Sequence, residues 1–141
     1  MVLKKTDRLR LVLFLAVIPA LLFAEGIFIK KSPLMIQEEK ALQKAASALS
    51  PCIKIKTGIH WFSFPTDQWT KMALGSTFCA AAIDALGRIC REKGETPPIT
   101  NFRCEFAKQG RQLRLQGSTM IFEVDFSTLG NYDFVYQSLT E

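Results

Sequence analysis

An uninterrupted apolar segment near the start of the chain constrains its fold and its location more than any other feature. Residues 11–24 read LVLFLAVIPALLFA and contain no charge, and basic residues flank them on both sides. A helix needs roughly 20 apolar residues to cross a hydrocarbon core of about 30 Å. The segment therefore predicts that the chain meets a membrane during its synthesis.

Two interpretations of this segment fit the sequence. In the favoured one, residues 11–29 form an uncleaved transmembrane anchor that follows a basic cytoplasmic tail at residues 1–10. In the other, it is a secretory signal peptide, because its apolar core has signal-peptide length and the small residues of Ala24-Glu25-Gly26 allow cleavage after Gly26. Four basic residues precede the core, so either interpretation leaves the N-terminus in the cytoplasm and exports residues 32–141.

The expected location follows from this orientation. We expect an inner-membrane protein with a single pass and a periplasmic domain at residues 32–141, and the alternative is a secreted protein. Of the net charge of +5, residues 1–10 supply +3. No basic block follows Lys31 and no alternation of aromatic and basic residues marks a nucleic-acid face, so we expect membrane contact and no nucleic-acid partner.

All four cysteines lie in the part that we expect to be exported: Cys52, Cys79, Cys90 and Cys104. An even number in an exported domain predicts two disulfides, with four buried free thiols as the alternative. No CxxC pair is present, so we expect neither a zinc site nor thioredoxin-type chemistry.

Spacing limits the pairing of these cysteines. On one continuous helix, Cys79 and Cys90 lie about 16 Å apart along the axis, which is beyond the reach of about 7 Å between disulfide-bonded Cα atoms. Two connectivities remain. We favour Cys52–Cys79 with Cys90–Cys104, because a helix usually folds back on the strand that follows it; the other is Cys52–Cys90 with Cys79–Cys104.

The exported part has the pattern of a small α+β domain. Helical spacing and capping residues predict a helix from Ser32-Pro33 to Ser50-Pro51 and a second helix from Thr66 or Asp67 to about Lys93, bent near Gly75-Ser76. Alternating apolar residues predict strands at 52–56 and 59–64, joined at Thr57-Gly58, then at 100–107, 111–116 and 119–126, with an edge strand at 134–139.

These elements predict an antiparallel sheet packed against one long helix. The order is α-β-β-α-β-β-β, with a further strand at the end. The first six elements have the order of a permuted ferredoxin-like unit, which occurs in bitopic proteins of secretion and pilus assembly platforms. That likeness is one of element order alone.

No residue pattern predicts catalysis. The single histidine, His60, is expected on a strand face with Phe62 and Phe64, as a structural residue. The sequence contains no nucleophile elbow, no phosphate-binding loop and no dinucleotide fingerprint. We therefore expect a protein that is not an enzyme and that has no catalytic residue, no cofactor and no metal.

Aromatic residues are the main candidates for recognition. Most of them are expected in the core, but one or two of a group of four could bind a partner or line a groove for an apolar ligand. This group comprises Trp61, Phe62, Phe64 and Trp69.

Three functions fit the sequence. The favoured one is an assembly, accessory or structural subunit of a membrane or envelope protein complex, which binds other subunits through its exported domain. The first alternative is a secreted or periplasmic ligand-binding or sensor-accessory domain with a cleaved signal peptide. The second is a small exported enzyme without a recognisable motif.

Overall fold

The computed structural model describes residues 30–65, 73–95, 97–127 and 129–141. The chain divides into two units, Met1–Ser32 and Pro33–Glu141, and the second contains the fold. Within the described residues, no helix is both long and apolar enough to span a membrane. The predicted tail, the anchor at 11–29 and the cleavage position after Gly26 all lie outside the described residues.

The second unit is a small α+β domain, as the sequence predicts, and its sheet has four strands. Its helices and strands, in chain order, are α2 (Pro33–Ser47), β1 (Lys56–Ile59), the 3-10 turn η1 (Trp61–Ser63), the π-helical turn η2 (Leu74–Cys79), α4 (Ala80–Lys93), β2 (Asn101–Phe106), β3 (Gln112–Gln116), β4 (Thr119–Val124) and α5 (Asn131–Thr140).

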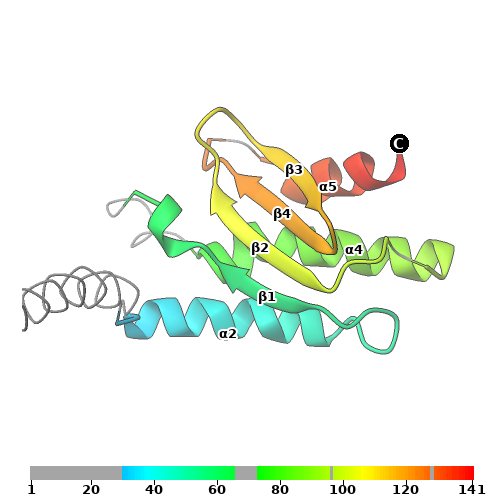
Figure 1. Cartoon of the computed structure of the whole chain (residues 1–141), viewed down its shortest axis with the longest axis horizontal. Helices are drawn as coiled ribbons and strands as arrows, with labels where there is room; N and C mark the ends of the chain where they lie inside the picture. The colour runs from blue at the N-terminus through cyan, green and yellow to red at the C-terminus, as the bar shows by residue number, and fades with distance from the viewer. Residues whose placement is uncertain (1–29, 66–72, 96, 128) are drawn as a thin grey trace, which may run out of the picture. The chain divides into compact units, whose positions relative to one another are not determined.

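The sheet is mixed, so the prediction of an antiparallel sheet was wrong. The strand order is β1-β2-β4-β3, in which β1 and β4 run parallel to β2 and only β3 is antiparallel to its neighbour β4 (Figure 1). The chain returns from β1 to β2 through α4, and such a crossover leaves the two strands parallel. β3 lies at the edge, so β4 takes the place beside β2.

The core lies between the sheet and the helices. Figure 1 shows α4 and α5 behind the sheet and α2 alongside β1. Phe102 and Cys104 of β2 face this core, as the predicted alternation requires, and join the fully buried Ile83 and Leu86 of α4. The opposite face of the sheet has no described helix over it, and we call it the open face.

The predicted hairpin at Thr57-Gly58 is absent, because both residues lie inside β1. The chain continues past Ile59 without folding back, and it then closes the short turn η1, in which the Phe64 N–H donates to the Trp61 carbonyl at 3.1 Å. The predicted strand at 59–64 is therefore wrong. With two strands no longer preceding the second helix, the permuted ferredoxin-like order is not found either.

The helix signals were more reliable. α2 begins at Pro33 as predicted and ends at Ser47, slightly before Ser50-Pro51. α4 ends at Lys93, where Gly94 takes a left-handed conformation with φ of 73° that glycine adopts easily. The expected bend at Gly75-Ser76 is η2, whereas the expected cap at Thr66 or Asp67 lies outside the described residues.

The last element is a helix, and the predicted edge strand at 134–139 was wrong. Tyr132, Val135, Tyr136 and Leu139 recur at helical spacing and pack on or into the core as parts of α5. Apolar and polar residues alternate weakly within 134–139, which suggested a strand. The helical period becomes visible only over the longer segment Asn131–Thr140.

Candidate functional site

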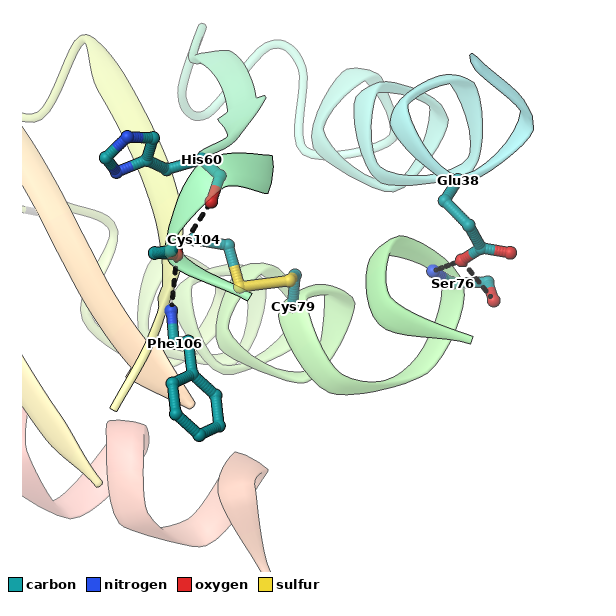
Figure 2. The surroundings of a disulfide bond; sticks show 7 residues. Glu38, His60, Ser76, Cys79, Cys104 and Phe106 are labelled. Atoms are coloured by element: carbon teal, nitrogen blue, oxygen red, sulfur yellow. Dashed lines mark hydrogen bonds between the residues drawn. A yellow bond between two sulfur atoms is a disulfide. The ribbon is translucent and has the colours of Figure 1, made fainter. Parts of the chain in front are cut away.

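The cysteines form two pairs at a distance compatible with disulfide bonds. The Cα atoms of Cys52 and Cys90 are 6.3 Å apart, and those of Cys79 and Cys104 are 5.9 Å apart (Figure 2). The exclusion of Cys79–Cys90 holds. The favoured pairing was wrong, and the alternative pairing is the one present.

The direction of α2 relative to α4 explains this pairing. Glu38, early in α2, bonds to Ser76, just before α4, and Leu49, just after α2, lies close to Gly87 in the second half of α4. The turn that carries Cys52 therefore reaches Cys90. β2 follows α4 in the chain, and the Cα atom of Cys104 within β2 lies 5.9 Å from that of Cys79, the residue just before α4.

Of the four aromatic candidates, the structure exposes Phe62. Phe64 is only 4 % exposed and packs with its ring centroid 6.0 Å from those of Phe106 and Phe126. Trp61 is partly buried, and its indole N–H donates to Glu39 Oε1 at 2.8 Å. Trp69 lies outside the described residues, and Phe62 is 67 % exposed.

The turn that carries Phe62 is fixed to the sheet at both ends. The His60 N–H donates to the Cys104 carbonyl at 2.8 Å, and the Phe106 N–H donates to Ser63 Oγ at 2.9 Å. Ser63 Oγ in turn donates to the His60 carbonyl at 2.6 Å. His60 therefore follows a strand and does not share a strand face with Phe62 and Phe64 as predicted. Figure 2 places His60 and Phe106 beside the Cys79–Cys104 pair.

A group of charged side chains, with one histidine, covers the open face next to this turn. Glu105 is its centre: Arg103 Nε lies 2.6 Å away and His60 Nδ1 lies 3.4 Å away, both from Oε1. Arg114 of β3 lies 3.7 Å from Glu105 Oε2 and 3.5 Å from Glu123 Oε1. We call His60, Arg103, Glu105, Arg114 and Glu123 the Glu105 cluster.

The strand register explains why the cluster contains both signs of charge. Glu105 and Glu123 are register partners on the adjacent parallel strands β2 and β4, where two carboxylates would repel each other. Arg103 and Arg114 are both register partners of Ile121, one from each side of β4. Ile121 is fully buried although it lies on the open face, which fits coverage by the arginine alkyl stems.

A groove of about 540 Å³ runs beside the cluster, and its lining includes Phe62, Glu105, Lys108, Gln112 and Glu123. The Ser63 hydroxyl in its wall is already committed to two backbone partners. No three metal-ligating side chains come together in the described ranges. The groove thus presents an exposed aromatic ring beside paired charges and amide groups.

Arg103, Glu105 and Glu123 lie within the predicted strands at 100–107 and 119–126, but the sequence pattern does not bring them together. Alternation along each strand gives the face that a residue occupies, whereas the cluster depends on β4 lying between β2 and β3. A meander, with β3 beside β2, would have given different neighbours.

Comparisons with protein-family models, with curated proteins and with solved structures found no match to this chain.

Proposed function

We propose that this chain is a non-enzymatic, single-pass membrane protein whose exported domain, residues 32–141, is an assembly, accessory or structural subunit of a membrane or envelope complex. The observation that carries the proposal is Phe62, a highly exposed aromatic side chain held beside the Glu105 cluster.

Phe62 has the properties of an anchor for a protein partner. Its ring is 67 % exposed, while hydrogen bonds from the residues on either side of its turn hold the backbone in place. A fixed aromatic residue loses little conformational entropy on binding, and aromatic residues surrounded by polar groups dominate many interfaces. The charged cluster would form the polar rim.

The expected location rests on two features that agree. The apolar segment 11–24 with its preceding basic residues predicts export of the chain beyond it. The two cysteine pairs at disulfide distance suit an oxidising compartment, because disulfides persist there and are rare in the cytosol.

A second candidate is a periplasmic or secreted ligand-binding domain with a cleaved signal peptide. The groove beside Phe62 favours it, since about 540 Å³ is within the size range of small-molecule sites. Intact mass separates the two candidates: an anchor leaves the chain starting at Met1, and cleavage leaves it starting at Ile27.

Photo-cross-linking in native cells tests the partner-binding role. A benzoylphenylalanine at position 62 is expected to give a defined cross-link to another subunit in the membrane fraction, since the ring would lie in the interface. The same group at Leu129, which is 90 % exposed, is the control and should give no such product. Equal products from both positions, or none from position 62, would refute the role of Phe62.

A topology reporter tests the location independently. A reporter fused after Glu141 is expected to be active on the periplasmic side, because the basic residues precede the apolar segment. Activity on the cytoplasmic side alone would overturn the proposed location.

A further inference from the structure

The two edges of the sheet differ in what covers them. At the outer side of β1, the Thr57 N–H and hydroxyl both donate to Gln43 Oε1 of α2, at 3.2 and 2.9 Å. Gln43 Nε2 also donates to the Ile55 carbonyl at 3.4 Å. β3 forms the other edge, and within the described part of the chain it pairs with β4 alone. We call the outer side of β3 the open edge.

The backbone groups at the open edge belong to Leu113 and Leu115. Gly117-Ser118 forms a two-residue turn, and Gly117 has φ of 60°, so Gln116 and Thr119 are a hydrogen-bonded pair at its base. Hydrogen-bonded and non-hydrogen-bonded pairs alternate along an antiparallel ladder. The N–H and C=O groups of Leu113 and Leu115 consequently point away from β4.

The side chains of the open edge leave apolar surface uncovered. Leu113 and Leu115 lie opposite the buried Phe122 and Met120, so both belong to the helix-covered face. Leu115 nevertheless remains 54 % exposed. Among the described residues, nothing pairs with these outward backbone groups, and they lie beside an exposed leucine, a combination that accepts another strand.

We infer that the open edge pairs with β3 of a second copy of this chain, antiparallel and about a two-fold axis at Arg114. The sequence Gln-Leu-Arg-Leu-Gln of β3 reads the same in both directions. Antiparallel pairing about its centre places Leu113 opposite Leu115 of the second copy, and Gln112 opposite Gln116. The outward N–H and C=O groups of each leucine pair then bond to each other.

Arg114 is the residue at which this arrangement could fail. At the two-fold axis it lies opposite Arg114 of the second copy, and like charges opposite each other are destabilising. Each Arg114 already lies 3.5 Å from Glu123 and 3.7 Å from Glu105 of its own sheet. These carboxylates offset the repulsion. The contact is confined to one short strand and is therefore weak, so the two copies associate at high concentration or when held in one membrane. The inference does not depend on the partner of Phe62.

Cross-linking of the purified full chain tests the register. Benzoylphenylalanine at Gln112 is expected to give a covalent dimer whose cross-link maps next to Gln116 of the second copy. The same group at Lys56, an exposed residue of β1, is the matched control and should not give this product. Equal dimer from both positions, or a cross-link that maps away from β3, would overturn the inference.

Substitution at Leu115 tests the contact by its strength. Leu115→Pro removes an outward N–H but leaves the ladder with β4 intact, and it is expected to weaken the dimer about tenfold or more in sedimentation equilibrium. Leu115→Lys retains the backbone donor and puts a charge opposite Leu113 of the second copy. We expect it to weaken the dimer by a similar factor. The Leu115→Lys variant keeps the test decisive if the proline variant misfolds. Leu129→Lys is the control and should dimerise as the unaltered chain does.

These results separate the inference from the proposed function. A chain that stays monomeric at every concentration, or a Leu115→Lys variant that dimerises normally, would overturn the dimer even if Phe62 still cross-links to another subunit. Loss of the Phe62 product with an intact dimer would count against the proposed function alone.

Discussion

Gly75 shows how one residue sets the approach of two helices. A Cβ atom built at this position would overlap the backbone carbonyl of Glu38, which cannot move without displacing α2. The side chain of Glu38 is also used at this contact: one carboxylate oxygen accepts the Ser76 N–H at 2.8 Å and the Ser76 hydroxyl at 3.0 Å. Glu38 is 5 % exposed, and these donors explain how a carboxylate is accommodated there.

Gly75→Ala should destabilise the domain. Since the added methyl group meets backbone, we expect the free energy of unfolding to fall by about 1–3 kcal/mol, the usual cost of overpacking. Urea denaturation of the full chain measures it. Gly58→Ala is the control: no heavy atom lies within 4 Å of its added Cβ, and the change should stay below about 1 kcal/mol. Equal effects at the two glycines would contradict this role of Gly75.

At the scale of elements, a polar contact joins α4 to α5. Arg88 and Glu92 form an ion pair one turn apart on α4, with Nε and Oε1 at 2.7 Å. The Tyr136 hydroxyl of α5 donates to Glu92, and the Arg88 guanidinium lies 3.9 Å from the centre of the Tyr136 ring. The hydrogen bond from Arg88, followed by that from Tyr136, lowers the pKa of Glu92 below its ordinary value of 4.5.

This contact predicts a pH dependence. A carboxyl group whose pKa is lower in the folded chain stabilises the fold above its unfolded pKa, and this stabilisation is lost as the pH falls through its folded pKa. Glu92→Gln should therefore lose less stability than the unaltered chain between pH 7 and acidic pH, measured by urea midpoints.

Tyr136→Phe is the matched variant for this prediction, because it keeps the ring under Arg88 and removes only the second of the two hydrogen bonds. Its acid dependence should fall between those of the unaltered chain and Glu92→Gln. A Glu92→Gln variant with the full acid dependence would show that the contact does not carry it.

Elements with strong local signals could be predicted, and those set by distant partners could not. Pro33 marks the start of α2 and Gly94 marks the end of α4 by their own backbone preferences. Both helix boundaries were predicted correctly. β1 was displaced because Thr57-Gly58 can form either a turn or part of a strand, and its pairing with β2 decides the outcome. The order of β3 and β4 likewise depends on contacts far along the chain.

At the scale of the whole molecule, the cysteine pairs join the layers. Cys52–Cys90 ties the turn after α2 to α4, and Cys79–Cys104 ties the start of α4 to the sheet. The sequence correctly indicated two pairs and excluded one of three connectivities. Choosing between the other two required the relative direction of α2 and α4, which no local pattern contains. The Glu105 cluster was missed for the same reason, since it needs the strand order.

Reduction should open the two pairs in sequence. Cys52 lies in an exposed turn, whereas Cys79 and Cys104 are fully buried. Since exchange requires access of a thiolate to the sulfur, a mild thiol should first open Cys52–Cys90 and leave Cys79–Cys104 intact. Alkylation followed by peptide mapping measures this order, and reduction in denaturant is the control, in which both pairs should open together.

Two results would contradict this prediction. Peptides that link Cys52 to Cys79 would show that the connectivity differs from the structure. Simultaneous loss of both pairs in the folded chain would show that burial does not protect Cys79–Cys104.

The Gln43 side chain has a consequence for how far such molecules can assemble. Because Gln43 bonds to the Thr57 N–H and the Ile55 carbonyl at the outer side of β1, these groups are not available to the strand of a further copy. Association through strand pairing therefore ends at the dimer. The same side chain thus protects the chain from the continued strand addition that produces fibres.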